Sequence, residues 1–526
     1  MSHRSRPGDL IARLDTADPR DQRAIGQQIE RLGAAAVPTL IEALTSGPAS
    51  TRKAAAFLLG RHKTAADAIA ALCRAVADDS EPKVRKNAAV SLGRIGAPAA
   101  VERLAAALER EPVAWVRPSL ILAIGAIGGE AAHQALGALH VEGDTEQEAL
   151  GKATQRSAPR QHVTAWRRDR APDLGLMLDV PAGLEEVASG EATERGIGRL
   201  ALQLAGRLRC PAGLAPWDVF PVMRCAKRLL IEAGQGAALD ASSVDDSGRT
   251  VTELIEGSEV LRGTREWLQT SRDAVTFRLS VEGVRLRRDT LRALVQASRV
   301  AGRRYGLVDS PSDYDLQLVI ETGDGESRLY VVPSFVEDTR FAYRQRDVGA
   351  AIDPVVAAGL ARLAGPPTGQ HRATVFDPTC GSATLLVERA MFDPQAHLVG
   401  LDVSPTAMAA ARRNIAAAGL SRRTRIATGD AADLTNWPAC DVVLANLPFG
   451  LRTRRQDADL PALYQAIVRH LAARLAPGGT AVLYTARPRL MEACLDDARA
   501  RLAVERRLTV RSGGLAPTAW VLRRPH

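Results

Sequence analysis

The stretch ATVFDPTCGSATLLVERA, residues 373–390, decides the fold of the last third of the chain. Its apolar start, 373–376, is typical of a buried strand, and Asp377 follows directly. Small residues at 379–383 then form a short loop, and a helical pattern begins at about Thr384. Such a loop between strand and helix lets backbone amides approach a bound nucleoside. The stretch therefore predicts an α/β domain with a nucleoside site at its first loop.

The segments that follow continue this α/β pattern. HLVGLD (397–402) and RTRIATGD (423–430) are predicted strands that lead into Asp402 and Asp430, and CDVVLAN (440–446) leads into NLPFG (446–450). An acid at the end of the second strand is where a ribose is held in such folds. Three more predicted strands bring the total to seven: GGTAVLYT (478–485), RRLTV (506–510) and TAWVLRR (518–524). A predicted helix at 488–502 lies between the first and second of these.

The order of these motifs resembles that of class I S-adenosylmethionine-dependent methyltransferases, whose fold is Rossmann-like. More narrowly, DPTCGSATLLVE (377–388), GDA (429–431) and NLPFG resemble the THUMP-associated guanine-N2 RNA methyltransferases. NLPFG is similar to the (D/N)PP(Y/F) pattern of enzymes that methylate planar amino groups, and closer still to the DLPFG of eukaryotic tRNA guanine-N2 enzymes. The resemblance covers about 173–526 and leaves the first 150 residues outside.

The resemblance implies a role for each matching residue. Asp402 would accept hydrogen bonds from the ribose hydroxyls of S-adenosylmethionine, and Asp430 with the backbone of Ala431 would contact adenine. The floor under the methionine and ribose would be formed by Asp377, Cys380, Gly381 and Ser382. The competing interpretations are that Asp402 and Asp430 only cap helices, and that Cys380 is a small buried residue or a nucleophile.

The resemblance also implies the catalytic residues. Asn446 and the Pro448 carbonyl would hold the target amine, and Phe449 would stack on the flipped base or, alternatively, pack in the core. The sequence departs from the family pattern at Ala383, where Gly is usual, and at Leu447, where the first Pro is usual.

Three arginines follow this loop at 452, 454 and 455. We predict that Arg452, Arg454 and Arg455 bind RNA phosphates, with a merely solvated face as the alternative. AIDPVVAAGLARL (351–363) is a predicted helix before the first strand. The resemblance implies that it covers the cofactor, and core packing is the alternative.

The middle region, 172–345, is predicted to be α/β. LGLMLDV (174–180) begins a strand–turn–helix unit, and AVTFRLSVEGV (274–284) is a strand followed by a helix at 286–302. DYDLQLVIETG (313–323) and SRLYVVPS (327–334) form a predicted hairpin. The region resembles a ferredoxin-like segment plus a THUMP module, which implies RNA binding.

The first 140 residues contain a helical repeat. Leu40, Leu72 and Leu104 lie 32 residues apart, and glycines at 60, 93 and 125 recur with nearly the same spacing. Such a period predicts stacked helical hairpins, an α-solenoid that resembles HEAT-like repeats. We expect the glycines to end the second helix of each hairpin in a left-handed conformation.

Recurring arginines and a polar segment complete this part. Arg52, Arg85 and Arg117 are predicted to brace the helix turns, with a phosphate-binding ladder as the alternative. Residues 141–171 are polar and predict a linker, whose arginines are expected to be solvated, with RNA contact as the minor alternative. The predicted domains are therefore 1–140, 141–171, 172–345 and 346–526.

Charge and cysteine content restrict the function. The chain of 526 residues has a formal net charge of +9. Residues 1–150 carry 18 basic and 18 acidic side chains, whereas residues 371–526 carry 21 basic and 13 acidic side chains. Basic surface is thus expected near the catalytic domain, and a protein partner at the repeats. The six cysteines form no metal-binding spacing, and no apolar run has membrane-spanning length, so a cytoplasmic protein without a metal is expected.

Together these patterns predict a cytoplasmic, S-adenosylmethionine-dependent RNA methyltransferase that forms N2-methylguanosine in tRNA. One alternative is an amino-methyltransferase that acts on adenine in DNA or on a protein glutamine, because NLPFG suits any planar nitrogen. The other is a non-catalytic adaptor that docks a protein through its repeats and keeps a degenerate methyltransferase domain.

Overall fold

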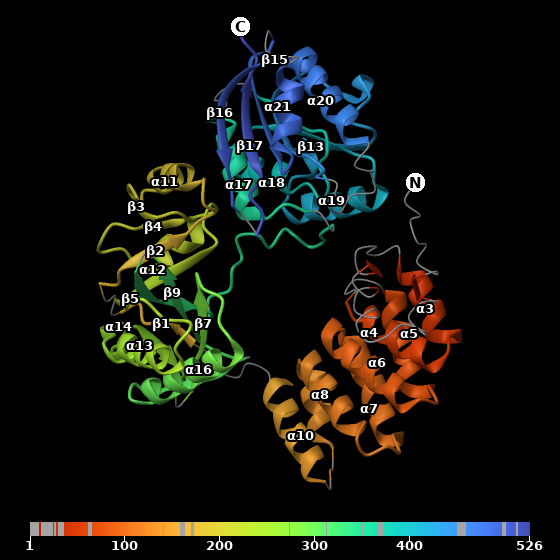
Figure 1. The fold of residues 1–526 in the computed structure, drawn as a ribbon. Helices are drawn as coiled ribbons and strands as arrows, with labels where there is room; N and C mark the ends of the chain where they lie inside the picture. The colour runs from red at the N-terminus through yellow and green to blue at the C-terminus, as the bar shows by residue number, and fades with distance from the viewer. Residues whose placement is uncertain are drawn as a thin grey trace. The chain divides into compact units, whose positions relative to one another are not determined.

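The computed structural model describes residues 10–11, 25, 28–29, 36–61, 66–139, 141, 143–157, 164–169, 173–272, 274–311, 313–323, 325–348, 351–366, 372–449, 459–496, 501–511 and 514–526. The chain forms two compact units, Met1–Val163 and Thr164–His526, which Figure 1 colours from red to blue along the sequence. Among the described residues, no helix is both long enough and apolar enough to cross a bilayer.

The first unit is built from paired helices in two rows (Figure 1). The first helices of the pairs are α3 (Val37–Ser46), α5 (Ala66–Asp78), α7 (Val101–Arg110) and α9 (Glu130–Gly137). The second helices are α4 (Ala49–Leu59), α6 (Pro82–Ile95), α8 (Arg117–Ile127) and α10 (Asp144–Ser157). Leu40, Leu72 and Leu104 are fully buried between the rows, as the 32-residue spacing predicts.

The recurring glycines do not end helices in a left-handed conformation, so that prediction was wrong. Gly60 has a φ of −62°, and Gly93 and Gly125 lie inside α6 and α8 without positive φ. The left-handed cap of α6 is Gly96, three residues later, with a φ of +73°.

Instead, each glycine allows the next second helix to approach closely. A Cβ on Gly60 would lie 2.4 Å from Ser91 Oγ, and one on Gly93 would lie 3.0 Å from Ala123 Cα. A Cβ on Gly125 would lie only 2.5 Å from the Cα of Ala153 in α10. The glycines therefore repeat because a side chain at these positions would push the second helices apart.

The contact with Ala153 also corrects the linker prediction. Residues Asp144–Ser157 form α10, which packs on α8 and buries Ala149 and Ala153. The polar composition of this segment is that of a surface helix whose buried face consists of small residues. The helical unit thus includes a fourth second helix. Within the predicted linker, residues 142, 158–163 and 170–171 lie outside the described residues.

The recurring arginines brace the repeats, as predicted. Arg52 donates to the Gly47 carbonyl of its own turn (3.0 Å) and forms an ion pair with Asp79 of the next repeat (2.8 Å). Arg85 with Glu111 (2.6 Å) and Arg117 with Glu146 (2.8 Å) repeat the arrangement. Because their guanidinium groups are engaged in this way, a phosphate-binding ladder is not favoured.

The middle region of the second unit contains an eight-stranded sheet in the order β3-β4-β2-β5-β10-β9-β7-β8. Its strands are β2 (Leu176–Asp179), β3 (Ala201–Leu204), β4 (Arg207–Arg209), β5 (Arg228–Ala237), β7 (Val275–Glu282), β8 (Leu307–Asp309), β9 (Leu316–Gly323) and β10 (Glu326–Pro333). A separate pair joins β1 (Thr164–Trp166) to β6 (Leu268–Thr270). The predicted hairpin is present, because β9 and β10 pair antiparallel. The central strand β5 was not predicted, and it joins both halves into one sheet by pairing with β2 and β10.

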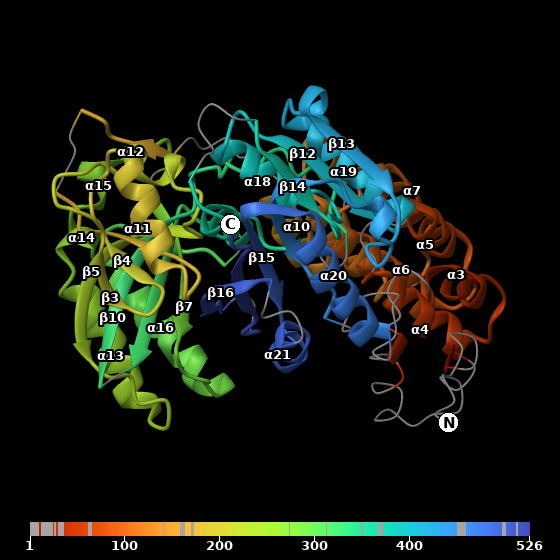
Figure 2. The ribbon, with the colours of Figure 1, turned by 90° about the horizontal axis from the view of Figure 1, so that it is seen from above.

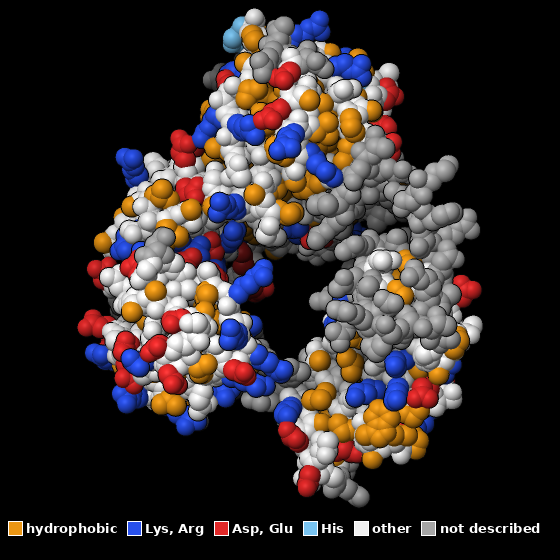
Figure 3. Space-filling view, viewed as in Figure 1, with side chains coloured by type: hydrophobic (Ala, Val, Ile, Leu, Met, Phe, Trp, Pro, Cys, Tyr) orange, Lys and Arg blue, Asp and Glu red, His pale blue; other side chains and the backbone are white. Residues whose placement is uncertain are grey.

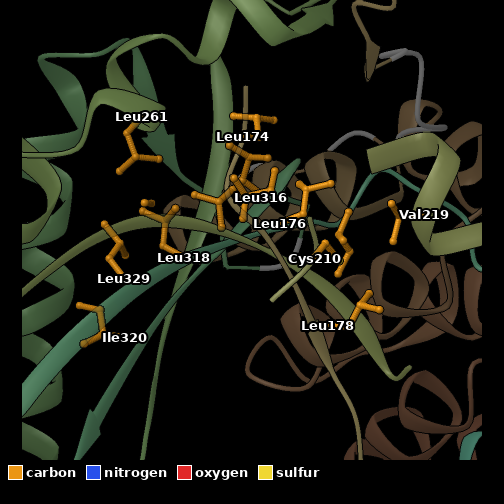
Figure 4. Close-up of a cluster of buried hydrophobic side chains, with 14 of the residues drawn as sticks. Leu174, Leu176, Leu178, Cys210, Val219, Leu261, Leu316, Leu318, Ile320 and Leu329 are labelled. Carbon is orange, nitrogen blue, oxygen red and sulfur yellow. The ribbon is translucent and has the colours of Figure 1, made fainter. Parts of the chain in front are cut away.

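Helices cover one face of this sheet. The longer ones are α11 (Glu185–Glu194), α13 (Val244–Glu256) and α16 (Arg288–Arg303), and the shorter ones are α12 (Pro216–Val219), η3 (Phe220–Val222), α14 (Glu259–Arg262) and α15 (Thr264–Trp267). Figure 4 shows the leucines of β2 and β9, including Leu176, Leu178, Leu316 and Leu318, in one buried cluster. These side chains alternate along their strands and so lie on a single face.

The C-terminal domain contains a seven-stranded sheet in the order β13-β12-β11-β14-β15-β17-β16. Its strands are β11 (Thr374–Asp377), β12 (His397–Asp402), β13 (Thr424–Thr428), β14 (Cys440–Asn446), β15 (Leu475–Thr485), β16 (Ala503–Thr509) and β17 (Thr518–Arg523). The first five are parallel, and β17 is antiparallel to both of its neighbours. The strand order reverses between β11 and β14, where doubly wound sheets bind ligands.

Helices cover both faces of this sheet. On one face lie α17 (Pro354–Leu363), α18 (Thr384–Phe392) and α19 (Pro405–Ala417), and on the other α20 (Leu460–Arg474) and α21 (Pro488–Asp496). Figure 2 shows α18 and α19 beside β12 and β13. The helix predicted at 351–363 is α17, and nearly all its side chains are buried. Core packing is therefore its main role.

Buried ion pairs join the middle region to the C-terminal domain. Glu388 of α18, 1% exposed, accepts two hydrogen bonds from Arg224 (2.7 and 2.8 Å) and one from the Tyr343 hydroxyl (2.6 Å). Arg362 of α17 donates to Glu191 of α11 (3.2 Å). These contacts fix the helix that begins at the first loop against the middle region.

Candidate active site

The predicted site residues lie at one edge of the seven-stranded sheet. Asp377, Asp402 and Asn446 are the last residues of β11, β12 and β14, and Asp430 follows β13 by two residues. Because these strands are parallel, their carboxyl ends meet at the same edge. The structure thus brings together four loops that are separated by up to 70 residues in the sequence.

The first loop, 377–383, is compact and held by its own backbone. Asp377 is 1% exposed, and its Oδ1 accepts from the Thr379 amide at 2.9 Å. The Cys380 amide donates to the Leu401 carbonyl of β12 (2.9 Å). Ala383 has a φ of +65° and is the only residue other than glycine with a positive φ among those described. This left-handed conformation explains why glycine would be usual at position 383.

Asp402 connects the first loop to the end of the second strand. Its Oδ2 accepts from the Gly381 amide at 3.0 Å and its Oδ1 from the Ser404 amide at 2.8 Å. Its backbone carbonyl accepts from Gly429 at 3.1 Å, just before Asp430. The half-buried carboxylate is therefore fixed in place and does more than cap a helix.

The third loop is closed over buried side chains. Asp430 accepts from the Ala432 amide at 2.9 Å. The carbonyl of the buried residue Ala431 accepts from the Trp437 indole at 2.9 Å and contacts a ring nitrogen of His470 at 3.3 Å. These bonds fix the backbone at the position that would face an adenine.

The fourth loop, from Asn446 to Phe449, is bound to the first. The Thr379 hydroxyl donates to the Asn446 carbonyl at 3.3 Å. Leu447 is buried, and its amide donates to the Tyr484 carbonyl of β15 (3.0 Å). Phe449 is half-buried and contacts the Tyr484 ring edge-on, with centroids 6.2 Å apart. Its side chain thus packs partly in the core and is not fully buried.

Three residues that the sequence did not indicate support this loop. The Tyr464 hydroxyl donates to the Pro448 carbonyl at 3.0 Å and lies 2.6 Å from the Thr485 hydroxyl. Arg487 donates to the Phe449 carbonyl at 2.9 Å. Thr485 is the last residue of β15. It could have been found as Asn446 was, as a polar residue at the carboxyl end of a predicted strand. Tyr464 lies in α20, and no sequence signal distinguishes it from a core tyrosine.

A buried asparagine supports the first loop from behind. The Asn414 side chain is fully buried in α19 and donates to the Ser382 carbonyl (3.0 Å) and the Arg346 carbonyl (2.8 Å). The Arg346 amide donates back to Asn414 Oδ1 at 3.0 Å. The segment RFAYRQRD (340–347) is therefore attached directly to the site.

Burial dominates the electrostatics of the first loop. It raises the pKa of the Asp377 carboxyl well above its ordinary value, and the nearby charge of Asp402 adds to the effect. Burial also raises the pKa of the Cys380 thiol, which is thus not a thiolate at neutral pH. A thiol is a poor nucleophile, so Cys380 fits the role of a small loop residue.

The arrangement can orient a ligand but offers no covalent catalyst. Carboxylate and carbonyl oxygens gather at a loop of small residues, and the described residues contain no metal-binding group of His, Cys, Asp and Glu. Arg452, Arg454 and Arg455 lie outside the described residues, as does Gly450, so their predicted contact with RNA stays a prediction.

Comparison with known proteins agrees with this geometry. Residues 342–516 match the RMKL-like methyltransferase domain family, and residues 37–125 and 71–153 match HEAT repeats. The tRNA (guanine(6)-N2)-methyltransferase of Thermus thermophilus is 34% identical over 174 residues, 33% of this chain and 50% of that protein. The U6 snRNA (guanine-N(2))-methyltransferase THUMPD2 of Mus musculus is 27% identical over 274 residues, which cover 49% of this chain and 50% of that protein.

The fold also has a solved counterpart. TrmN from Thermus thermophilus superposes with a TM-score of 0.52 at 25% identity, covering 67% of this chain and 99% of TrmN. The chain spans about half the length of the curated relatives it matches. These matches confirm the predicted helical repeats, the Rossmann-like domain and the family resemblance, whereas the THUMP assignment stays a prediction. Residues 342–516 thus form an RMKL-like methyltransferase domain, and HEAT repeats precede it in the chain.

Proposed function

We propose that the protein transfers a methyl group from S-adenosylmethionine to N2 of guanine in RNA, with tRNA as the substrate. The observation that carries this proposal is the 446–449 loop at the switch point of the sheet, bound to the small-residue loop through Thr379. The guanine-N2 activity in the names of the two RNA-modifying relatives supports the choice of base.

The first three loops fit an adenosine-type cofactor. A Cβ on Gly381 would meet only Val348 Cγ2, at 3.7 Å, so the backbone is open there. S-adenosylmethionine bound at this edge would supply an electrophilic methyl group. Asp402 accepts from the ribose hydroxyls, and Asp430 with the Ala431 backbone binds adenine. The remaining lining is formed by Asp377, Cys380, Gly381 and Ser382.

The fourth loop fits a planar amine. Asn446 and the Pro448 carbonyl accept the two N–H groups of guanine N2, which directs its lone pair away from them. Tyr464 fixes the Pro448 carbonyl, which keeps a second lone pair for the amine. Such orientation supplies up to roughly 7–11 kcal/mol in well-aligned reactions. Phe449 stacks on the base, which must leave its helix to reach the loop.

The middle region and the arginines after the fourth loop serve RNA binding in this proposal. The middle region, as a THUMP-like module, positions structured RNA, and Arg452, Arg454 and Arg455 bind its phosphates. We place the enzyme in the cytoplasm, because all six cysteines are free thiols and disulfides are rare in that compartment.

Transfer of a labelled methyl group from S-adenosylmethionine to unmodified tRNA tests the proposal. Digestion of the product should yield N2-methylguanosine. The Asn446→Ala variant should lose about 10²–10³-fold in kcat, the usual effect of removing one positioned hydrogen-bond partner, without losing cofactor affinity. Methylation of duplex DNA or of a glutamine-containing peptide in place of RNA would overturn the RNA assignment.

Calorimetry distinguishes the enzyme from an adaptor. The unmodified chain should bind S-adenosylmethionine, and Asp402→Ala should weaken binding by at least tenfold, because a charged hydrogen bond contributes about 1.5–3 kcal/mol. A chain without measurable affinity would instead indicate a degenerate domain.

A further inference from the structure

The acidic and basic side chains of the first unit lie on different helices. The second helices α4, α6 and α8 contain no Asp or Glu, whereas each first helix carries at least one. The zero net charge of residues 1–150, which by itself indicates no nucleic-acid surface, therefore hides an uneven distribution of charge among the helices. The helices α4, α6 and α8 are therefore basic, whereas α10, the last second helix, carries Asp144, Glu146 and Glu148.

Several cations of this row remain available. Arg52, Arg85 and Arg117 are engaged by the carboxylates of the next repeat. Lys53, Lys83 and Arg94 are exposed, and none forms an ion pair with a carboxylate among the described residues. They extend from α4 to the end of α6, so the basic face spans successive repeats.

Aromatic rings lie among these cations. The Phe57 ring is covered by the guanidinium of Arg61 (5.1 Å) and by that of Arg94 from the next repeat (5.0 Å). Lys86 lies 5.7 Å from the centre of the Trp115 ring. Phe57, Val90 and Trp115 (37%, 37% and 50% exposed) are all the large apolar side chains that the described part of the first unit exposes.

These side chains share one continuous surface. Successive second helices pack more closely than successive first helices, because of the glycine contacts described above. In a stack of hairpins the more closely packed row lies on the inside of the curve, so the cations and rings line its inner side. Figure 3 shows Lys and Arg side chains next to exposed apolar side chains on this unit.

We propose that this inner face, defined by Lys53, Phe57, Lys83, Lys86, Arg94 and Trp115, binds RNA. The lysines and Arg94 bind phosphates, and the half-exposed Trp115 stacks on an unpaired base. An acidic polypeptide would need only the cations, whereas rings interleaved with cations are typical of single-stranded nucleic-acid surfaces. The inference rests on the proposed function, because it assumes that the substrate is RNA.

The salt dependence of tRNA binding tests the face in the full chain. The triple variant Lys53→Gln, Lys83→Gln and Arg94→Gln removes three phosphate contacts. The slope of log affinity against log salt should fall by about 2–3, and affinity near 0.1 M salt should weaken roughly tenfold or more. Trp115→Ala should weaken binding without changing the slope.

A matched control removes the same charge from the first helices. The control triple Arg74→Gln, Arg103→Gln and Arg110→Gln takes three exposed cations from α5 and α7, and its slope should equal that of the unmodified chain. Equal slopes for both triple variants would overturn the proposal. So would loss of polyglutamate binding by the first triple with unchanged tRNA binding, because the face would then bind an acidic protein.

Methyl transfer to tRNA, measured in parallel, separates the two proposals. We expect the inner-face triple to raise KM for tRNA and to leave kcat unchanged. Normal KM and normal tRNA binding in this variant would contradict the inner-face proposal alone. If the unmodified chain neither bound nor methylated RNA, the proposed function would fail as well.

Discussion

The Pro448 carbonyl depends on one hydroxyl group behind it, that of Tyr464. We predict that Tyr464→Phe lowers kcat about tenfold, because the carbonyl loses the donor that fixes its direction. The Kd for S-adenosylmethionine should stay unchanged, since the Tyr464 hydroxyl bonds Pro448 and Thr485, which lie outside the loops proposed to bind the cofactor. Steady-state kinetics and calorimetry measure the two quantities.

A neighbouring tyrosine provides the control for this prediction. Tyr484 is also buried and contacts Phe449 through its ring, so Tyr484→Phe removes a hydroxyl of the same kind without touching the Pro448 carbonyl. Burial raises the pKa of Tyr464 to about 12, so no ionisation of this group should enter the pH profile below pH 10. Equal losses of kcat in both variants would refute a positioning role.

Asp377 should make stability depend on pH. Burial and the charge of Asp402 raise its folded-state pKa above the ordinary value, so the folded protein holds the proton more strongly than the unfolded chain. The free energy of unfolding then decreases as pH rises through that folded-state pKa. The Asp377→Asn variant should therefore melt at a higher temperature than the unmodified chain at neutral pH. This difference in Tm should vanish as the pH is lowered toward the ordinary pKa range of aspartate. A constant difference in Tm across pH would contradict this.

At the residue scale, the sequence predicted the site residues whose positions depend only on the order of the strands. Asp377, Asp402 and Asn446 end parallel strands, so their shared edge followed from the order of strands and helices alone. Tyr464 and Asn414 could not be predicted in the same way, because each bonds a backbone carbonyl from a distant segment. Such partners depend on how helices pack, which single-residue patterns do not encode.

At the scale of elements, two glycines in neighbouring helices allow a matched test. Gly125 in α8 faces Ala153, and an added Cβ would lie 2.5 Å from its Cα. We predict that Gly125→Ala costs about 1–3 kcal/mol of unfolding free energy through overpacking. Gly151 in α10 is exposed with open space around it, so Gly151→Ala should add up to about 1 kcal/mol. Urea unfolding of both variants measures the difference, and stabilisation by both would refute the packing role.

The elements that the sequence missed share a physical cause. Residues 144–157 bury small side chains such as Ala149 and Ala153, so their helical face carries little apolar signal. The strand β5 ends in the exposed, glycine-containing segment 234–237, which weakens its strand pattern although its centre is buried. In both cases tertiary contacts, which the local pattern does not contain, decide the structure.

At the scale of the molecule, the contact between Arg224 and Glu388 couples two regions. We predict that Arg224→Met costs about 3–5 kcal/mol, because a buried carboxylate loses its partner. Arg224→Met combined with Glu388→Gln should recover most of this loss, since the amide can still accept from Tyr343. Urea unfolding of the single and double variants measures the coupling.

An exposed ion pair across the same boundary is the control. Arg506 and Glu186 also join the C-terminal domain to the middle region, but their side chains are 43% and 80% exposed. Arg506→Gln should therefore change stability by no more than about 1 kcal/mol. Equal costs at the two pairs would contradict the role assigned to burial.

The repeated contacts of the first unit make it modular in length. Each interface between repeats uses the same parts, a glycine under the next second helix and an arginine that reaches the next turn. A repeat can therefore be duplicated or excised between equivalent positions, and the rejoined neighbours meet through an interface they already possess. Insertions and deletions in steps of 32–33 residues are thus the changes that evolution or engineering can make here without redesigning a core.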